Sequence, residues 1–438
     1  MYSIDWSNIF PRKRAKPVDQ SAVADGSSPR RKSFISIPAV SRTVWALGFT
    51  SLLTDISSEM IASILPLYLV LQLGLSPLAF GVVDGIYQGF AALVRVLSGV
   101  VSDRWKKYKA TAQLGYGLSA VCRILILACG SGWGAIASII AIDRVGKGIR
   151  TAPRDAMIAQ STPKSQLATA FGVHRGLDAA GAMLGPVIAF ALLYIKPDRF
   201  DLIFVASFAI GLIGVAVISL FVKQPESVVT DSKTVTKPAF TVSSLLRDRP
   251  FWSILLVGSL LGLGTISDSF IYLILQKRIG LGAMAFPLLY VGTSLVTSIF
   301  AVTFGQLADV IGRKWVFLFG YTLLAGVYSL LFLTTGGGIP LVIGAIVLMG
   351  VYYAATDGVL TAMAAAVLPA EACGTGLAVF ATATNVSRIL ASVLFGLLWT
   401  NLGNRGAVQY YFIALIIALI AAVIFLKPVK TVPSSAHH

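Results

Sequence analysis

Long hydrophobic runs alternate with short polar stretches along most of the chain. A helix needs about 20 mostly apolar residues to cross the hydrocarbon core of a bilayer. The runs reach that length, so we expect them to be membrane-spanning helices. The pattern predicts twelve spans, at residues 44–73, 78–101, 110–130, 133–160, 167–195, 202–222, 251–275, 286–307, 315–334, 340–368, 374–399 and 408–426.

The composition supports a membrane environment for these runs. Of the 438 residues, 56% are hydrophobic and 12% are charged, whereas roughly 25% of the residues of a soluble domain are charged. The mean hydropathy is +0.82. So few charged residues cannot cover a water-facing surface. We therefore expect an all-α integral membrane protein that has the lipid bilayer as its main surroundings.

The net charge of +16 raises the question of nucleic-acid binding. Most Lys and Arg residues lie near the N-terminus, in a polar stretch after the sixth expected span and in alternate connections. That distribution is the one that the positive-inside rule describes for cytoplasmic loops. We therefore expect no nucleic-acid partner, and we expect both termini to be cytoplasmic. The expected organisation is a tail (1–43), a six-helix bundle (44–222), a cytoplasmic linker (223–250), a second six-helix bundle (251–428) and a tail (429–438).

Two short charged stretches lie 206 positions apart, each between two hydrophobic runs. The second reads GQLADVIGRK, residues 305–314, and the first reads GVVSDRWKK, residues 99–107. The pair Ala156-Met157 recurs at the same offset as Ala362-Met363. A repeat of this kind predicts two related halves.

Both charged stretches resemble the signature loop of the major facilitator superfamily, which has a Gly, an Asp four residues later and then a basic cluster. The first copy departs from the pattern because Lys106 stands where a Gly is usual. The resemblance implies two pseudo-symmetric six-helix bundles that work by alternating access. It also implies that the loop charges of Asp103, Arg104, Asp309 and Arg313 hold the cytoplasmic side closed, and we expect Gly99, Gly305 and Gly312 to belong to the same conformational gate.

The fourth expected span carries an unusual number of charges. Asp143, Lys147, Arg150 and Arg154 are spaced so that they lie on one helical face. Each charge at the bilayer centre costs about 2.5–3.5 kcal/mol on insertion scales, so this face must line a wet cavity or pair inside the protein. We expect Asp143, Lys147 and Arg150 to bind substrate.

The same span also resembles the superfamily's fourth-helix motif, whose Arg corresponds to Arg144 and is implicated in proton coupling. Lys147 departs from that motif, which usually has Gln at this position. The alternative for Arg144 is an internal ion pair, with Asp143 or Asp178, that fixes the helix packing.

The fifth expected span contains Gly172, Gly181, Gly185 and Pro186. Small residues allow helices to approach closely, and a Gly-Pro step favours a local bend. The spacing resembles a motif of the superfamily's proton-coupled exporters, although Ala189 and Phe190 replace its final small pair. We expect these four residues to act in the conformational change. Packing alone is the alternative.

Further candidates for proton coupling lie at helical spacing within the expected spans. His174 and Asp178 are i, i+4 neighbours, and so are Asp55 and Glu59. Two carboxylates on one buried face repel each other when both are charged, which favours protonation of one of them. We expect Asp55, Glu59, His174 and Asp178 to take part in proton coupling, with Arg144 as the partner that tunes the protonation of a carboxylate. The alternative for His174 and Asp178 is a structural hydrogen bond.

The second half offers Asp268, Asp357 and Arg388 as substrate-binding candidates, with Asp84 in the second span as a further intramembrane carboxyl. Arg123 and Arg388 are also compatible with helix packing.

No residues show metal-ligand spacing, and no protease, esterase or phosphate-loop motif is present. We expect a monomer without metal or cofactor, and not an enzyme. The chain is expected to resemble bacterial proton-coupled drug or metabolite exporters of the inner membrane, which move a small amphipathic or partly ionised molecule outward in exchange for protons. The alternative is a proton-coupled importer of an organic anion or metabolite.

Overall fold

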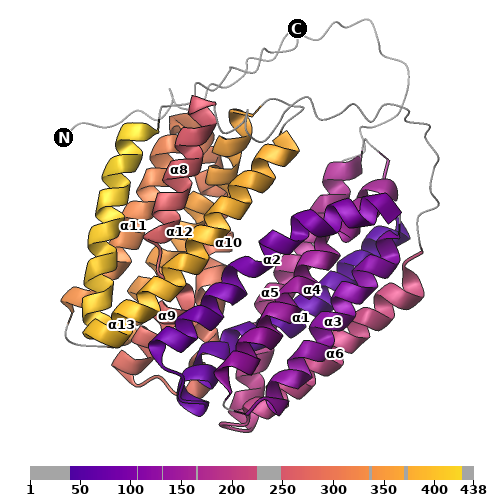
Figure 1. Ribbon diagram of the computed structural model, residues 1–438, viewed down its shortest axis with the longest axis horizontal. Coiled ribbons are helices and arrows are strands. Elements are labelled where there is room, and N and C mark those ends of the chain that lie inside the picture. The colour runs from indigo at the N-terminus through magenta and orange to yellow at the C-terminus, as the bar shows by residue number, and fades with distance from the viewer. Residues whose placement is uncertain are drawn as a thin grey trace, which may run out of the picture. The chain divides into compact units, whose positions relative to one another are not determined.

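The computed structural model describes residues 40–105, 107–130, 132–163, 166–223, 248–334, 338–368 and 373–426. Side chains 92, 93, 95–105, 167, 168 and 373–375 lie outside the description. The described part of the chain belongs to one compact unit that begins at Val40. It is nearly all helical and contains no strand (Figure 1). Among the described residues, nine helices are long and apolar enough to cross a membrane.

The helices fall into two sequential groups, which we call the N-half and the C-half. The N-half consists of α1 (Arg42–Leu67), its π-helical continuation η2 (Tyr68–Gln72), α2 (Pro77–Trp105), α3 (Tyr108–Ala128), α4 (Trp133–Gln160), α5 (Leu167–Ile195) and α6 (Phe200–Phe221). The C-half consists of α8 (Arg249–Leu263), α9 (Asp268–Ile279), the short 3₁₀ helix η4 (Ala283–Ala285), α10 (Pro287–Ile311), α11 (Arg313–Leu333), α12 (Ile339–Ala366) and α13 (Cys373–Phe425).

These bounds agree with most of the expected spans, and α4 has the predicted ends. Non-helical backbone at Gly403, with φ 72°, divides α13 where the sequence predicts two spans. The number of membrane crossings, twelve, stays a prediction. The expectation that residues 99–107 and 305–314 are loops was wrong for most of their length. Helix α2 continues to Trp105 and α10 to Ile311, and the latter connection is the single residue Gly312, whose φ of 101° suits glycine.

The seventh expected span is broken in the structure. Helix α8 ends at Leu263, and α9 begins at Asp268 after a non-helical stretch. The hydroxyl of Tyr328 on α11 accepts from the backbone N–H of Ile266 at 2.6 Å and donates to the carbonyl of Gly264 at 3.1 Å. A break in a membrane helix leaves backbone polar groups without helical partners, and other groups must satisfy them. The Tyr328 hydroxyl does so here.

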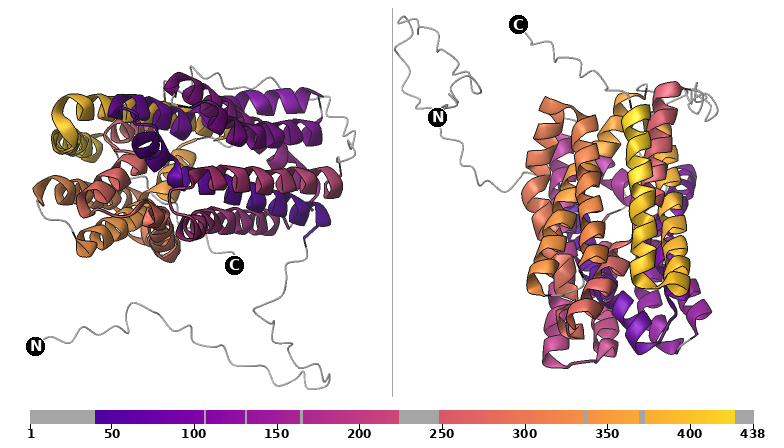
Figure 2. Two further views of the ribbon diagram at one scale, coloured as in Figure 1. Left: turned by 90° about the horizontal axis from the view of Figure 1, so that it is seen from below. Right: turned by 90° about the vertical axis from the view of Figure 1, so that its left-hand side faces the viewer.

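Each half packs mainly within itself. In the N-half, α1 packs on α5 and α6, and α4 packs on α2 and α3. In the C-half, α12 packs on α10 and α11, and α13 packs on α8. Between the halves, α2 lies against α13 and α5 lies against α10. The helices of both halves run between the same two ends of the molecule, and those of the N-half are tilted relative to those of the C-half in the view of Figure 1 (Figures 1 and 2).

The two ends of the helix bundle differ. We call the end where α1 and α8 begin and α6 ends the linker side, and the opposite end, which includes the connection between α1 and α2, the hairpin side. On the hairpin side an aromatic cluster joins the halves, because the Phe270 ring on α9 lies 4.8 Å from Phe80 on α2 and 5.5 Å from Trp399 on α13. Phe80 and Phe270 are both buried. The hairpin side is therefore closed.

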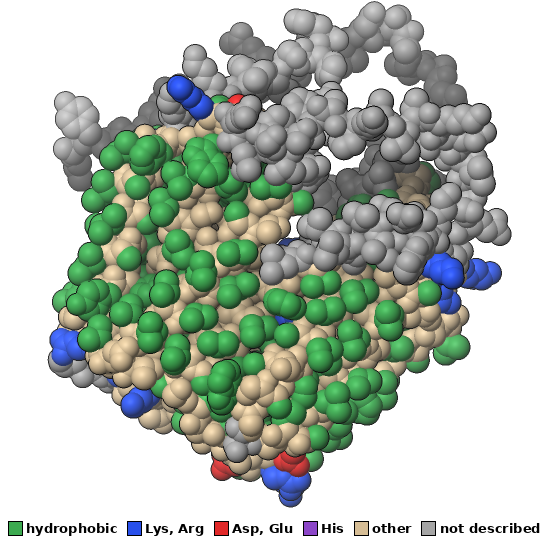
Figure 3. Space-filling model, in the orientation of Figure 1, with side chains coloured by type: hydrophobic (Ala, Val, Ile, Leu, Met, Phe, Trp, Pro, Cys, Tyr) green, Lys and Arg blue, Asp and Glu red, His purple; other side chains and the backbone are tan. Residues whose placement is uncertain are grey.

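Toward the linker side the facing helices are more exposed. Most described side chains at the start of α5 and at the end of α10 are exposed or half-buried. A Cβ added at Gly172 or Gly305 would meet no atom within 4 Å. The lateral faces of the molecule carry many exposed hydrophobic side chains, while Lys and Arg gather at its edges (Figure 3). This distribution fits a multi-pass membrane protein.

Candidate functional site

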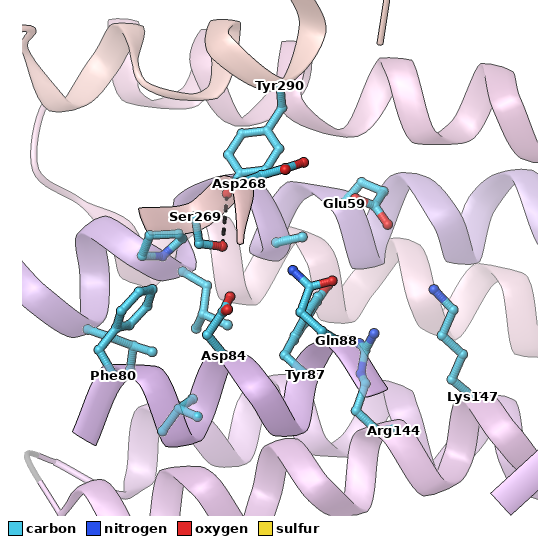
Figure 4. A pocket seen from close by; sticks show the side chains of 15 residues that line it. Glu59, Phe80, Asp84, Tyr87, Gln88, Arg144, Lys147, Asp268, Ser269 and Tyr290 are labelled. Atoms are coloured by element: carbon cyan, nitrogen blue, oxygen red, sulfur yellow. Dashed lines mark hydrogen bonds between the residues drawn. The ribbon is translucent and has the colours of Figure 1, made fainter. Parts of the chain in front are cut away.

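A cavity of about 300 Å³ lies between the two halves, next to the aromatic cluster. Helices α1, α2 and α4 line it from the N-half, and α9 and α10 line it from the C-half. Three carboxyl groups and two cations reach it, together with two tyrosines (Figure 4). These residues are Glu59, Asp84, Asp268, Arg144, Lys147, Tyr87 and Tyr290.

Glu59 on α1 and Lys147 on α4 are the charged groups of this cavity without a fixed partner. Their side chains attract each other, but no ion pair within 4 Å and no hydrogen bond joins either one to another described residue. Charged groups inside a membrane protein are normally paired with each other or with backbone carbonyls. Glu59 and Lys147 are thus available to a ligand or a proton.

Arg144 is held more firmly. Its guanidinium forms an ion pair with Asp143, with Nε 2.9 Å from Oδ2, and lies 4.0 Å from the centre of the Tyr87 ring. Both charged residues are buried. The pairing with Asp143 is the internal ion pair that the sequence left open as an alternative. The Tyr87 hydroxyl is buried and has no hydrogen-bond partner among the described residues.

A second group of charges lies along α4 on the linker side of Lys147. Arg150 lies 3.6 Å from Asp55 on α1 and 4.5 Å from the centre of the Tyr116 ring. The expected substrate-binding residue Arg150 therefore pairs with an expected proton-coupling residue. It does not reach the cavity.

The predicted His174–Asp178 neighbours on α5 do meet. Nδ1 of His174 lies 3.5 Å from Asp178 Oδ2, and its Nε2 lies 3.0 Å from the Ser51 hydroxyl on α1. Arg154 on α4 lies 3.8 Å from Asp178 and 3.0 Å from Asp155. The structure thus joins α1, α4 and α5 through polar side chains, and both the proton-coupling and the structural reading of His174 stay open.

The C-half candidates divide into two places. Asp268 lines the cavity at the start of α9 and accepts a hydrogen bond from the Tyr353 hydroxyl on α12. Asp357 on α12 and Arg388 on α13 are exposed side chains that attract each other, and neither lines the cavity. Of the six expected substrate-binding residues, Lys147 and Asp268 line the cavity, and Asp143 lies behind it as the partner of Arg144.

The predicted conformational residues also have distinct environments. A Cβ at Gly181 would lie 2.6 Å from the Leu52 carbonyl oxygen, and one at Gly185 would lie 2.7 Å from that of Ile56. These glycines let α5 touch the α1 backbone beside Asp55 and Glu59. Pro186 follows them in the helix and is buried.

The charged stretch of the C-half makes its described contacts within that half. Arg313 lies 3.3 Å from Asp309 and donates to the Ala362 carbonyl on α12 at 3.1 Å. The backbone at Gly99, Asp103 and Arg104 is helical, but their side chains lie outside the described part of the chain. Their predicted gating role stays a prediction.

The sequence did not identify some polar residues of the site, and for others it did not predict the hydrogen-bond partner. Arg123 donates to the hydroxyls of Ser57 and Ser58 at 2.5 and 2.8 Å, contacts that fit the helix-packing alternative. The adjacent serines in an apolar run were a signal for such a partner. Tyr87 and Tyr353 gave no signal, because a tyrosine in an apolar helix is ordinary. Within the described ranges, no group of three or more His, Cys, Asp or Glu side chains could hold a metal ion.

Comparisons with known proteins support a transporter fold. The family model described as Major Facilitator Superfamily matches residues 47–296 and 269–437. An uncharacterized MFS-type transporter of Methanocaldococcus jannaschii is 31% identical over 365 residues, which cover 82% of this chain and 89% of that protein.

Solved structures of transporters have the same fold. A mutant of the nucleoside transporter NupG has a TM-score of 0.75 at 14% identity, and the match covers 88% of this chain and 100% of that chain. A POT family transporter in complex with 5-aminolevulinic acid has a TM-score of 0.72 at 15% identity, covering 88% and 95% of the two chains.

Proposed function

The chain belongs to the Major Facilitator Superfamily, and from that premise we propose that it exports a small amphipathic or partly ionised molecule in exchange for protons. The family and fold make it a multi-pass secondary transporter. The proposal adds the direction, the coupling ion and the kind of substrate.

The observation that carries the proposal is the Glu59 carboxyl in a cavity between the halves, without an ion pair among the described residues. Glu59 is half-buried, and a carboxylate inside a membrane protein without a partner is costly, so it favours either a proton or a cationic group of a ligand. A proton and a cationic substrate that compete for Glu59 cannot be bound there together. Such competition couples the outward movement of one to the inward movement of the other.

The linker side supplies a route to this group. We propose that it faces the cytoplasm, with both termini there and with the inner membrane as the location. The structure is then open toward the cytoplasm and closed on the outer side by the aromatic cluster around Phe270. In this state substrate reaches Glu59 from the cytoplasm and a proton leaves by the same route. Asp55 and the His174–Asp178 pair line up along α1 and α5 as candidate stations for that proton.

The close contact of α5 with α1 is the second support for export. Gly181 and Gly185 bring α5 onto the backbone turn that carries Asp55 and Glu59. A change of charge on α1 therefore acts directly on the packing of α5, which contacts α10 of the other half. We further propose that the N-half and C-half act as two bodies of one monomer, with the predicted bounds 44–222 and 251–428.

Lys147 favours the second candidate function, the import of an organic anion together with protons. Its ammonium group reaches the cavity without an ion pair among the described residues. An anionic substrate would be attracted there. Transport direction separates the two candidates, because the same gradient moves the substrate in opposite senses.

The test uses inverted membrane vesicles, whose interior corresponds to the outside of the cell, with an imposed acid interior. The probes are ethidium as an amphipathic cation, 5-aminolevulinic acid as a zwitterion and uridine as a neutral molecule. Export predicts that a charged probe accumulates in the vesicles and that a protonophore abolishes the accumulation. Gradient-driven loss of a preloaded probe would favour the importer instead.

Glu59→Gln and Asp55→Asn test the coupling residues in the same assay. We expect each substitution to lower gradient-driven accumulation at least tenfold while the protein stays in the membrane at wild-type amount. Asp201→Asn is the control, since Asp201 is a partly exposed carboxyl at the start of α6 outside the cavity, and it should retain most of the activity. Wild-type accumulation by the Glu59 and Asp55 variants would remove both residues from the coupling mechanism.

A further inference from the structure

Asp84 on α2 is a buried carboxyl at the contact between the two halves, and the proposed coupling residues do not include it. Its side chain is almost fully buried, with 4% of the residue exposed. Asp84 lines the cavity from the hairpin side (Figure 4). It therefore lies where the halves must separate when that side opens.

The helices around Asp84 touch through their backbones. A Cβ at Gly81 would lie 2.6 Å from the Ser392 carbonyl oxygen on α13, and one at Gly85 would lie 2.9 Å from that of Ile389. Between these two glycines, Asp84 reaches across the contact and accepts a hydrogen bond of 2.7 Å from the Ser392 hydroxyl. Closure of the hairpin side thus removes Asp84 from water and gives it a neutral partner.

The charged surroundings of Asp84 do not compensate a negative charge. No ion pair joins it to a base within 4 Å among the described residues. Arg144 is already paired with Asp143. The titratable and charged groups nearby on the packed elements are Glu59 on α1, Tyr87 on α2 itself, Arg144 and Lys147 on α4, Asp268 on α9, Tyr290 on α10 and Arg388 on α13, one helical turn from Ser392.

Asp268 adds a like charge from the opposite half. It begins α9 and lines the same cavity, and Ser267 and Ser269 on either side of it face Asp84. Two carboxylates that approach without a cation between them cannot both stay ionised at low cost. Closure brings Asp84 of the N-half toward Asp268 of the C-half, so a proton must neutralise one of them.

We propose that Asp84 binds a proton when the hairpin side closes and that loss of this proton opens the side again. The proton-binding residue is then part of the contact that moves. This inference goes beyond the proposed exchange at Glu59, and it holds for export and for import alike. In both cases a proton taken up from the hairpin side favours the state that is open on the linker side.

The sign of the pH dependence follows from this assignment. The closed state binds one more proton than the open state, so raising the pH favours opening. While Asp84 is protonated in the closed state and ionised in the open state, the open-to-closed ratio rises tenfold for each pH unit. A neutral residue at this position removes the dependence.

The experiment measures the hairpin side directly, in the full-length protein in lipid nanodiscs. Spin labels are attached at Gln72→Cys, after α1, and at Asn401→Cys on α13, both exposed positions in the two halves. Cys122, Cys129 and Cys373 are replaced by Ser in this background. Pulsed electron paramagnetic resonance then gives the distribution of distances between the two spin labels, measured from pH 5 to pH 9 without any substrate.

In the labelled protein with Asp84 we expect short distances at low pH and a growing long-distance population as pH rises, by up to tenfold in ratio per unit. Asp84→Asn should keep short distances at every pH, and Asp84→Ser provides a second neutral variant. Ser392→Ala should shift the ratio toward opening by about two- to tenfold, because the hydrogen bond is lost, but should keep the pH dependence.

Asp201→Asn is the matched control, a partly exposed carboxyl at the start of α6 on the hairpin side that pairs with Arg199, and it should keep the pH-dependent opening. The proposal is overturned if the distances in the spin-labelled parent protein do not change with pH. It is overturned equally by a neutral Asp84 variant that responds like the parent. Because no substrate is involved, loss of gradient-driven transport with an intact opening response would count against the proposed function only.

Discussion

The N-half and the C-half hold their buried charges by different means. In the N-half, α4 supplies arginines that pair with carboxylates, as in Arg144–Asp143 and Arg150–Asp55. In the C-half, the part of the chain that the structure describes contains one ion pair, Arg313–Asp309, near the linker-side end. The cavity carboxyl of that half, Asp268, is held by the Tyr353 hydroxyl.

Tyrosines dominate the polar interior of the C-half. Their rings pack against each other, as where Tyr272 lies 4.6 Å from Tyr290 and Tyr321 lies 5.3 Å from Tyr352. Tyrosine buries a large apolar ring and still offers a hydroxyl, so it lines a ligand site without a fixed charge. The C-half therefore has a polar but mostly neutral interior.

This difference indicates a division of work between the halves. An ion pair favours the charged form of both partners, whereas a hydroxyl can form a hydrogen bond with a carboxyl group in either protonation state. We expect substitutions in the N-half to alter stability and proton coupling strongly. We expect substitutions in the C-half to have smaller effects on stability and to act mainly on substrate preference.

The largest expected effect comes from the buried ion pair of the N-half. Asp143→Asn leaves the Arg144 guanidinium buried without its carboxylate, and an uncompensated buried charge costs about 3–5 kcal/mol of unfolding free energy. The C-half control is Asp309→Asn, because Asp309 is 67% exposed in its pair with Arg313 and such a pair contributes about 0–1 kcal/mol. Denaturant unfolding in detergent micelles measures both.

The double variant Asp143→Asn with Arg144→Gln sharpens this test. Removal of both charges should recover much of the stability that the single change loses, since the cost lies in the unpaired arginine. Equal losses for Asp143→Asn and Asp309→Asn would show that the two halves do not differ in the way proposed.

Much of the fold could be predicted because apolar length and loop charge depend on local sequence. The ends of α4 and the charged face along it followed from that information. The break between α8 and α9 was not predicted, although Gly264, Thr265, Ser267 and Asp268 interrupt the apolar run at this point. The break depends on Tyr328, 62 residues away from Ile266, and such a contact is not visible in a local pattern.

The candidate site was predictable in its residue types and less so in its pairings. Asp55 and Glu59 were expected to influence each other as neighbours on one helix, and their charges do interact, but the sequence did not predict that Asp55 would pair with Arg150 while Glu59 lines the cavity. The contact of Asp84 with Ser392 spans 308 positions. Intramembrane charges identify the residues that matter, but only the packing of the two halves determines their partners.

The next largest effect is expected at the helix contact beneath the N-half charges. Gly185→Ala places a methyl group 2.7 Å from the Ile56 carbonyl oxygen and 2.8 Å from the Glu59 Cβ. Such overpacking costs about 1–3 kcal/mol, and it should also displace Glu59 and slow gradient-driven transport. The matched control on the same helix is Gly172→Ala, where a methyl group meets no atom within 4 Å.

Thermal unfolding and vesicle transport of these two glycine variants give the result. Gly172→Ala should match or slightly exceed the stability of the parent, because alanine favours the helix by up to about 1 kcal/mol. A Gly185→Ala protein as stable and as active as Gly172→Ala would mean that α1 and α5 can separate without cost.

The smallest effect is expected from the hydroxyl that replaces an ion pair in the C-half. Tyr353→Phe removes the donor to Asp268 and keeps the ring, so the lost hydrogen bond should lower the unfolding free energy by about 0.5–1.5 kcal/mol. Tyr410→Phe is the control, because Tyr410 is 57% exposed and makes no hydrogen bond within the described ranges through its hydroxyl. The same denaturant unfolding in micelles compares them. If Tyr353→Phe cost as much as Asp143→Asn, the C-half would depend on its hydroxyl contacts as strongly as the N-half depends on its ion pairs, and the proposed division between the halves would fail.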